Sequence, residues 1–246
     1  MTNETSAGVA VVTGASRKEG LGFEVARQLA RRGFVVFLTA RDAGAAEVNA
    51  AMLRAEGHDV RAHALDVASE ASASALVATL HHHFGRLDVL INNAGLAPDL
   101  QAPTLTADFD EVRQALEVNL FGPWRMIRML EPLLRNSARP RIVNVSSEAA
   151  SFNASGGMAR RGAVMGGYAV SKAAQNAMTM KMAAALAGTP ILVNAVCPGR
   201  IASHAGAAEA GARPVAEGAA GVVWAATLPE GGPSGGLFRD GQELPW

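Results

Sequence analysis

Stretches with the character of β-strands alternate with helical patterns along almost the whole chain, and this alternation constrains the fold most strongly. We expect strands at residues 9–12, 34–39, 60–65, 87–91, 141–145 and 191–196, with a last short one near Leu237. Helical patterns follow the first strand up to Gly33 and then cover residues 45–55, 70–84, 109–135, 168–186 and 215–228. Such alternation predicts an α/β fold, a doubly wound parallel sheet with helices on both faces.

One domain accounts for the whole length. A chain of 246 residues can form one large α/β domain or two small ones. No linker, repeat or charged tail divides it, and hydrophobic residues make up 49% of it, enough for a sizeable core. We therefore predict a single domain over residues 1–246. In such sheets, ligands bind at the carboxyl ends of the strands, near the point where the strand order reverses.

Composition narrows the classes of partner and compartment. The formal net charge is +0, so neither nucleic acid nor an anionic membrane is an expected partner. Cys197 is the single cysteine, which excludes an internal disulfide and fits a reducing compartment. Residues 1–8 lack an apolar signal core, and no stretch is long and apolar enough to span a bilayer. We expect a soluble cytoplasmic protein that acts on a small molecule.

The turn after the first strand is rich in glycine. A pyrophosphate-binding turn needs close backbone approach, and the following helix supplies amide donors and the positive end of its dipole. The spacing here is Gly14-x5-Gly20-x-Gly22. It differs from G-x-G-x-x-G, so the general Rossmann fingerprint is not met, although the predicted fold class remains Rossmann-like.

A tyrosine and a lysine stand four residues apart in the helical pattern after residue 167. The spacing of Tyr168 and Lys172 puts a phenol and an ammonium side by side on one helix face. A phenol loses its proton near pH 10, and an adjacent positive charge favours the phenolate. Alone, this pair is typical of a solvated helix face. Upstream, however, the chain also carries Asn92-Asn93-Ala94-Gly95, Asn119 and Ser146-Ser147.

With these motifs the sequence resembles the short-chain dehydrogenase/reductase family over nearly its whole length. The matching pieces are Thr13-Gly14 with Gly20-x-Gly22, Asp66-Val67, Asn92-Asn93-Ala94-Gly95, Asn119, Ser147, Tyr168-x-x-x-Lys172 and Pro198-Gly199. Residues 38–42 and the short C-terminal region resemble its NADPH-dependent carbonyl reductase branch. Two departures stand out: the glycine-rich turn has two extra residues, and 20 residues separate Ser147 from Tyr168, more than is usual. The added piece, 153–167, is expected to form a turn or mobile flap beside the substrate.

The resemblance implies hydride transfer from NADPH to a ketone or aldehyde carbonyl, reversible as alcohol oxidation. Tyr168 would give the proton, and Ser147, with Ser146 as its competitor, would hydrogen-bond the carbonyl oxygen. Lys172 would lower the pKa of Tyr168 and hold the nicotinamide ribose. Asn119 would hold a water that links Lys172 to solvent.

The resemblance also implies a set of cofactor contacts. These are Gly14, Ser16, Arg17, Lys18, Gly20, Leu21, Arg41, Asp66, Val67, Asn93, Ala94, Gly95, Tyr168, Lys172, Pro198, Gly199 and Ile201. The two extra residues of the turn leave open which of Arg17, Lys18 and Glu19 approaches the cofactor. Asp66 is expected at the adenine, with capping of the next helix as the alternative, and Asn92 is expected to support the sheet.

The end of the second strand predicts NADP(H) in preference to NAD(H). An NAD site usually places an acidic residue there, which binds the adenosine ribose. This chain has Ala40 followed by Arg41, and a guanidinium can bind a 2′-phosphate through paired hydrogen bonds. Arg17, together with Lys18, would add positive charge from the facing glycine-rich turn. Asp42 argues against this preference, because an adjacent carboxylate could bind a ribose hydroxyl, and we expect its side chain to point away from the cofactor.

Several alternatives remain open. The same fold could serve a 3-oxoacyl or polyketide ketoreductase, or a non-catalytic NADP(H)-binding sensor or scaffold. Residues 148–167 and 200–214 are expected to be loops on the substrate side. The family implies a homodimer or homotetramer, with a monomer as the alternative. The residues His81-His82-His83 suggest a metal site, but consecutive helical residues point about 100° apart, so we predict a solvated helix end and no catalytic metal.

Overall fold

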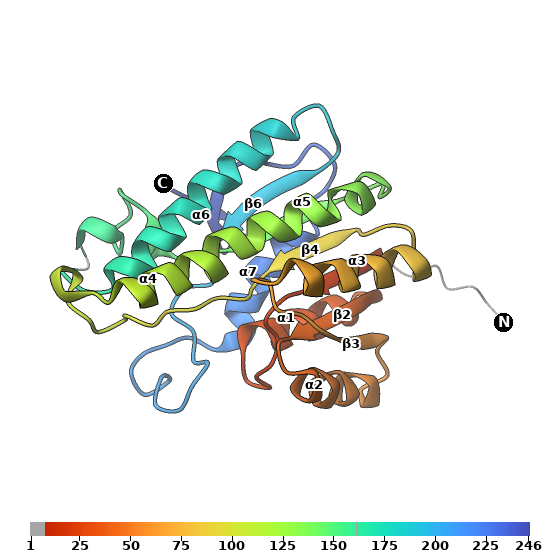
Figure 1. The fold of residues 1–246 in the computed structure, drawn as a ribbon, viewed down its shortest axis with the longest axis horizontal. Helices are drawn as coiled ribbons and strands as arrows, with labels where there is room; N and C mark the ends of the chain where they lie inside the picture. Colours follow the sequence, from red (N-terminus) through yellow and green to blue (C-terminus); the bar gives the residue numbers. More distant parts are fainter. Residues whose placement is uncertain (1–7, 161) are drawn as a thin grey trace.

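A single mixed sheet forms the centre of the protein. The computed structural model describes residues 8–160 and 162–246. Within these residues the sheet has eight strands in the order β3-β2-β1-β4-β5-β6-β7-β8 (Figure 1). The strands are β1 (Gly8–Val12), β2 (Phe34–Ala40), β3 (Val60–Ala64), β4 (Val89–Asn92), β5 (Arg141–Val145), β6 (Leu192–Val196), β7 (Leu237–Arg239) and β8 (Gln242–Leu244). Strands β1 to β7 pair in parallel and only β8 is antiparallel, which confirms the predicted α/β fold.

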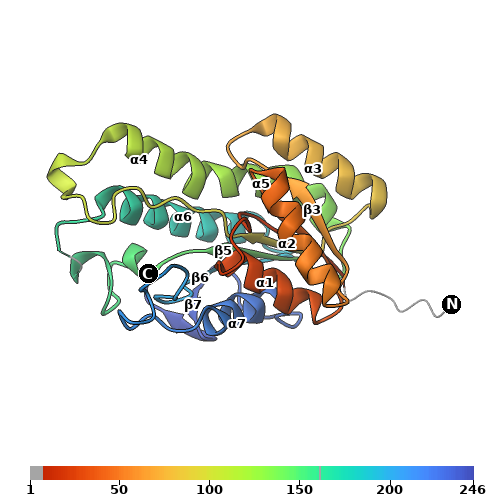
Figure 2. The same ribbon diagram turned by 90° about the horizontal axis from the view of Figure 1, so that it is seen from below.

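Helices cover both faces of the sheet. They are α1 (Leu21–Ala30), α2 (Ala43–Ala55), α3 (Glu70–His83), α4 (Phe109–Leu116), α5 (Gly122–Arg135), α6 (Gly166–Ala185) and α7 (Val215–Ala226). Helices α1, α2 and α7 pack on one face, whereas α3, α5 and α6 pack on the other (Figure 2). No helix among the described residues is both long and apolar enough to cross a membrane.

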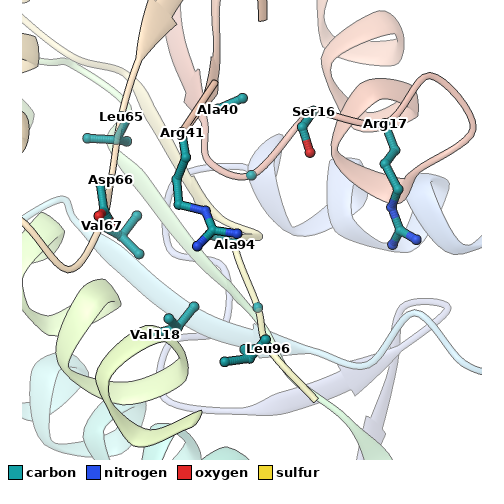
Figure 3. A pocket seen from close by; sticks show the side chains of 12 residues that line it. Ser16, Arg17, Ala40, Arg41, Leu65, Asp66, Val67, Ala94, Leu96 and Val118 are labelled. Carbon is teal, nitrogen blue, oxygen red and sulfur yellow. The ribbon is translucent and has the colours of Figure 1, made fainter. Parts of the chain in front are cut away.

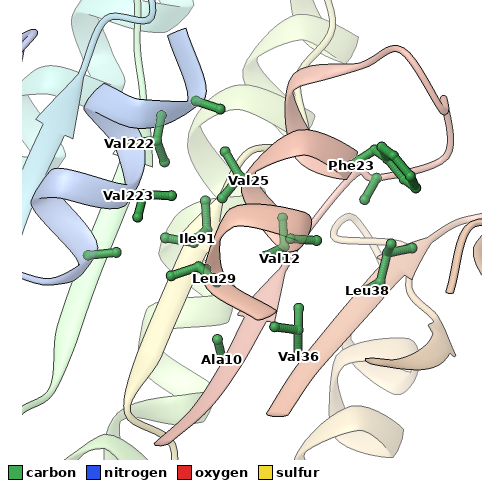
Figure 4. Close-up of a cluster of buried hydrophobic side chains, with 14 of the residues drawn as sticks. Ala10, Val12, Phe23, Val25, Leu29, Val36, Leu38, Ile91, Val222 and Val223 are labelled. Atoms are coloured by element: carbon green, nitrogen blue, oxygen red, sulfur yellow. The ribbon is translucent and has the colours of Figure 1, made fainter. Parts of the chain in front are cut away.

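The alternating side chains of the strands supply both cores. On β1, Ala10 and Val12 belong to the cluster under α1 and α7, whereas Val9 and Val11 belong to the cluster under α3 and α5. This is the two-residue period of a strand that is buried on both faces. Figure 4 shows the first cluster, in which Val25 of α1 and Val222 of α7 lie over the strands.

The strand order reverses between β1 and β4, and this reversal creates the site. The chain runs outward from β1 to β3 and then returns to place β4 on the other side of β1. The ends of these two strands are bonded together, because the Thr13 hydroxyl accepts hydrogen bonds from the amides of Asn93 (3.0 Å) and Ala94 (2.9 Å). Gly14 has φ 70°, and a Cβ there would lie 2.6 Å from the Cα of Ala94. Glycine therefore allows the first turn and the loop after β4 to meet.

Two parts of the structure differ from the sequence predictions. The helix expected over 109–135 is split into α4 and α5 by a π-helical turn, Glu117–Phe121, which carries Asn119. Such widened turns occur often at functional sites. Strand β8 was not predicted, because its residues Gln242–Leu244 have little apolar character and gain their strand conformation by pairing with β7.

Candidate active site

The glycine-rich turn accommodates its two extra residues by forming a tight corner. The Gly20 amide donates to the Arg17 carbonyl at 3.0 Å, which leaves Lys18 and Glu19 exposed at the tip. Helix α1 then begins at Leu21, and its N-cap Gly20 has no side chain to bond the first amides, so these remain available to an anion. A Cβ on Gly22 would lie 2.5 Å from Asn93 Nδ2, so this turn also packs closely against the loop after β4.

The first cavity lies beside the ends of β2 and β3. It has a volume of about 280 Å³ and is lined by Gly14, Ser16, Arg17, Ala40, Arg41, Leu65, Asp66, Val67, Ala94, Gly95, Leu96 and Val118. Figure 3 shows the Arg41 side chain projecting into it from the end of β2, with Ser16 and Arg17 on the facing turn. Asp42 does not line this cavity, because its carboxylate caps α2 and accepts from the amides of Gly44 (2.8 Å) and Ala45 (3.3 Å). The charged side chains that enter this cavity from the end of β2 and from the glycine-rich turn, Arg41 and Arg17, are therefore both cationic.

A second cavity opens at the carboxyl ends of β1, β4, β5 and β6. It has a volume of about 540 Å³. Its lining residues are Gly14, Arg17, Gly20, Leu21, Gly22, Asn93, Gly95, Leu96, Ala97, Leu100, Val145, Ser146, Ser147, Tyr168, Lys172, Cys197, Pro198, Gly199, Ile201, Ser203 and His204. The fold therefore brings Ser147, which follows β5, together with Tyr168 and Lys172 of α6.

The two adjacent serines have different surroundings. Ser146 is buried, and its hydroxyl donates to Asn176 Oδ1 at 2.6 Å. Ser147 is less buried, and its hydroxyl accepts from the Ala149 amide at 3.1 Å at the start of a short 3₁₀ turn. Because a hydroxyl can both donate and accept, Ser147 retains its donor proton for a ligand while it caps the turn. This difference favours Ser147 over Ser146.

Asn119 lies behind the second cavity and does not line it. Its side chain is fully buried in the π-helical turn. The Leu96 amide donates to Asn119 Oδ1 (2.8 Å), while Nδ2 donates to the Leu96 carbonyl (2.7 Å) and to Ser171 Oγ (2.9 Å). The residue therefore fastens the loop after β4 to α6, and its predicted contact with a water stays a prediction.

The amino end of α6 is held by a carboxylate from another part of the chain. Asp99 is only 2% exposed, and its two oxygens accept from the amides of Gly167 (2.6 Å) and Tyr168 (3.0 Å). A Cβ on Gly166 would lie 2.6 Å from Thr104 Cγ2, and one on Gly167 would lie 2.8 Å from a neighbouring valine methyl. The paired glycines thus allow close packing, and Asp99 supplies the missing cap.

Lys172 is buried at 4% exposure on the sheet side of α6. Its ammonium donates to the Val145 carbonyl at 2.8 Å and to Gln175 Oε1 at 3.2 Å. Burial lowers the pKa of Lys172 to about 7, and the nearby Cys197 opposes this shift. Cys197 Sγ in turn accepts from the Glu148 amide and from Arg239 Nη2, both at 3.1 Å.

A sequence profile described as short chain dehydrogenase matches residues 8–212 of this chain. The chain belongs to the short-chain dehydrogenase/reductase family. It is 37% identical over 205 residues to the monensin polyketide synthase putative ketoacyl reductase of Streptomyces virginiae, covering 82% of this chain and 73% of that protein. It is 39% identical over 158 residues to (+)-neomenthol dehydrogenase of Arabidopsis thaliana, a match that covers 56% of this chain and 53% of that enzyme.

Solved structures of the family have the same fold. A metagenomic short-chain oxidoreductase in complex with NADP superposes with a TM-score of 0.77 at 30% identity, covering 95% of this chain and 97% of the other. This chain therefore has a structural relative that binds NADP.

The predicted cofactor contacts of this short-chain dehydrogenase/reductase, with one exception, line one or both cavities. The residues that do so are Gly14, Ser16, Arg17, Gly20, Leu21, Arg41, Asp66, Val67, Asn93, Ala94, Gly95, Tyr168, Lys172, Pro198, Gly199 and Ile201. Lys18 is the exception, since it lines a separate hollow with Phe23 and Pro214. The arginine of the turn, not the lysine, faces the predicted cofactor site. Asp66 lines the first cavity, and its predicted contact with the adenine stays a prediction. The alternative role as helix cap is wrong, because Ser69 caps α3 and the Asp66 carboxylate accepts from the Ala68 amide (3.0 Å), which precedes the helix.

Sequence reasoning missed part of the second cavity. The missed residues Leu96, Ala97 and Leu100 form its wall after β4. Ser203 and His204 form its wall after β6 and lie in the segment 200–214, which was expected on the substrate side. Leu96 could have been suspected, because it directly follows the Asn-Asn-Ala-Gly motif. Asp99 gave no local signal, since the amides that it caps lie far along the chain.

The three consecutive histidines lie outside both cavities. They form the last turn of α3 and are exposed, as the prediction of a solvated helix end required. Among residues 8–160 and 162–246, no group of three or more His, Cys, Asp or Glu side chains is arranged to hold a metal ion.

Proposed function

We propose that this short-chain dehydrogenase/reductase transfers hydride reversibly between NADP(H) and the carbonyl carbon of a ketone or aldehyde. One observation carries the proposal: Ser147, Tyr168 and Lys172 line a single cavity that continues to the glycine-rich turn and the uncapped end of α1. The residues present fit a dinucleotide, because the glycine-rich turn and the uncapped amides of α1 line the same cavity and can bind a pyrophosphate. Bound NADPH would supply the hydride.

The side chains divide the remaining chemistry between them. Tyr168 donates a proton to the carbonyl oxygen, and Ser147 donates a hydrogen bond to the same oxygen as negative charge develops on it. Lys172, one turn further along α6, favours the phenolate when its own ammonium is charged. In the direction of alcohol oxidation, the Tyr168 phenolate accepts the proton. Negative charge develops on the substrate oxygen during both carbonyl reduction and alcohol oxidation. Hydrogen-bond donors that already point at this oxygen therefore lower the barrier of both reactions.

Two guanidinium groups support a preference for NADP(H). Arg41 follows Ala40 at the end of β2, the position where an NAD site usually has a carboxylate. Arg17 lines the same cavity from the glycine-rich turn, and the nearby Asp42 is used as the cap of α2. A 2′-phosphate at this place would meet positive charge and paired donors.

The ketoreductase alternative is supported by similarity to the polyketide synthase reductase, which aligns with 82% of this chain. The sensor or scaffold alternative would predict the loss of reactive side chains, yet Tyr168 and Lys172 both line the cavity. We also propose a homodimer or homotetramer, because Trp124 of α5 and Met180 of α6 are 45% and 46% exposed, whereas Met126 and Met178 belong to the core. A cytoplasmic location stays a prediction from the single cysteine.

The full chain can be tested by following the absorbance of NADPH and NADH with a panel of carbonyl compounds. The panel contains aliphatic aldehydes, cyclic ketones and β-ketoacyl thioesters. We expect NADPH consumption with at least one class, and faster turnover of the thioesters would select the ketoreductase alternative. Tight NADPH binding without turnover of any class would reject the enzymatic proposal in favour of the sensor.

A further inference from the structure

Most of the hydrogen-bond donors of Lys172, in the second cavity, already have acceptors within the protein. A lysine ammonium has three N–H donors. The Val145 carbonyl at the end of β5 takes one at 2.8 Å, and Gln175 Oε1 takes a second at 3.2 Å. The third is left for the cavity that Lys172 lines. The two protein acceptors therefore set the direction in which the remaining donor can act.

The burial of the Gln175 amide costs free energy of folding. It lies on the sheet-facing side of α6 and is fully buried, where an apolar side chain would pack at no desolvation cost. Its carbonyl oxygen binds Lys172, but its Nε2 has no hydrogen-bond partner among the described residues. A buried donor without a partner destabilises the folded chain, because it has lost its hydrogen bonds to water. The bond to Lys172 is the contact that accounts for an amide at this place.

A buried polar chain continues from Gln175 away from the cavity. The Thr179 hydroxyl donates to the Gln175 backbone carbonyl at 2.9 Å and accepts from Asn144 Nδ2 at 2.9 Å. Asn92 Nδ2 then donates to Asn144 Oδ1 at 2.8 Å. This chain joins the middle of α6 to β4 and β5, so the backbone that carries Gln175 is held firmly against the sheet.

The charged and titratable groups around Lys172 do not replace the amide. Tyr168 precedes it by one turn of α6, and Cys197 faces it from the end of β6. Arg17 and His204 line the same cavity, while Glu148 pairs with Arg239 beyond Cys197. No carboxylate among the described residues pairs with Lys172. Gln175 Oε1 and the Val145 carbonyl are thus its neutral stabilising partners.

We propose that Gln175 is a positioning residue for Lys172. The side-chain carbonyl of Gln175 fixes the buried ammonium and favours its charged form. The proposal deepens the proposed function and rests on it for its catalytic meaning. Hydrogen bonds to a charged donor are stronger than those to a neutral one, so Gln175 stabilises the ammonium more than the free amine. A charged Lys172 then keeps the phenolate of Tyr168 accessible.

The direct test measures the titration of Lys172 without requiring turnover. The chain has three lysines, so lysine labelled with ¹³C at Cε gives a simple spectrum, in which Lys172→Met identifies the signal. Gln175→Met keeps the size and helix preference but removes the acceptor. We expect the Lys172 midpoint to fall by about one to two pH units, the effect of losing one hydrogen bond to a charged group.

Two further variants keep the test decisive. Gln175→Glu places a carboxylate beside the ammonium and should raise the midpoint, which covers the case in which Gln175→Met does not fold. Thr179→Val breaks the polar chain without touching Lys172 and should leave the midpoint in place. An unchanged midpoint in folded Gln175→Met or Gln175→Glu would overturn the proposal, as would an equal shift in Thr179→Val.

The kinetic arm separates a positioning role from a merely structural one. In Gln175→Met, the weaker charge on Lys172 should raise the pKa of Tyr168, so the acid limb of alcohol oxidation should move to higher pH. A structural defect would lower kcat at every pH without moving this limb. If the wild-type chain shows no turnover, the proposed function fails, while the ¹³C titration still decides the role of Gln175.

Discussion

The cofactor preference can be tested most sharply at Arg41. Its guanidinium projects into the first cavity from the end of β2, but the residue is exposed at the rim. A hydrogen bond to a charged group contributes about 1.5–3 kcal/mol, and exposure to water favours the lower end of that range. Arg41→Ala should therefore weaken NADPH binding by about 1.5 kcal/mol, a little more than tenfold in Kd. NADH lacks the 2′-phosphate and should lose little affinity.

Isothermal titration calorimetry with both cofactors measures this difference without a substrate. Because Arg17 also lines the cavity, Arg41→Ala should retain part of the preference, and the double variant with Arg17→Ala should lose more of it. Arg139→Ala is the matched control, since Arg139 is exposed near the amino end of β5, at the opposite edge of the sheet. Equal weakening of NADPH and NADH by Arg41→Ala, or a wild-type preference for NADH, would refute the assignment.

Four further predictions concern the second cavity and the helix α6 beside it. Tyr168→Phe should nearly abolish turnover while calorimetry shows unchanged NADPH affinity, and near wild-type kcat would contradict its role as proton donor. Lys172→Met should lower both kcat and cofactor affinity, because the ammonium serves the phenol and the ribose. Unchanged cofactor affinity would contradict the role at the ribose, and unchanged kcat would contradict the role beside the phenol. The pKa of Lys172 is about 7 in the folded chain and near 10.5 when unfolded, so the unfolded chain binds more protons between these values. This group should therefore make the free energy of unfolding rise from pH 7 to pH 10, and urea denaturation of Lys172→Met should show a flatter dependence. Asp99→Ala should lower the free energy of unfolding by about 1–2 kcal/mol through loss of the cap of α6, and an unchanged urea midpoint would show that the cap contributes nothing.

The sequence determined the parts of this protein that depend on local period and spacing. The runs that became β1 to β7 are readable because a strand repeats every two residues and a helix every 3.6. The glycines of the first turn and the four-residue spacing of Tyr168 and Lys172 carry their meaning within one element. For the same reason, most of the residues predicted to contact a cofactor line the two cavities, since they follow the ends of strands.

Tertiary structure alone decided the contacts between segments that lie far apart in the chain. The closure of the corner at Gly20 turned Arg17, and not Lys18, toward the cavities. Asp99 caps a helix that begins 67 residues later at Gly166, and Gln175 is recognisable only because α6 packs its buried side against β5. A side chain's partner across such distances depends on how the elements pack, and neither residue type nor spacing encodes it.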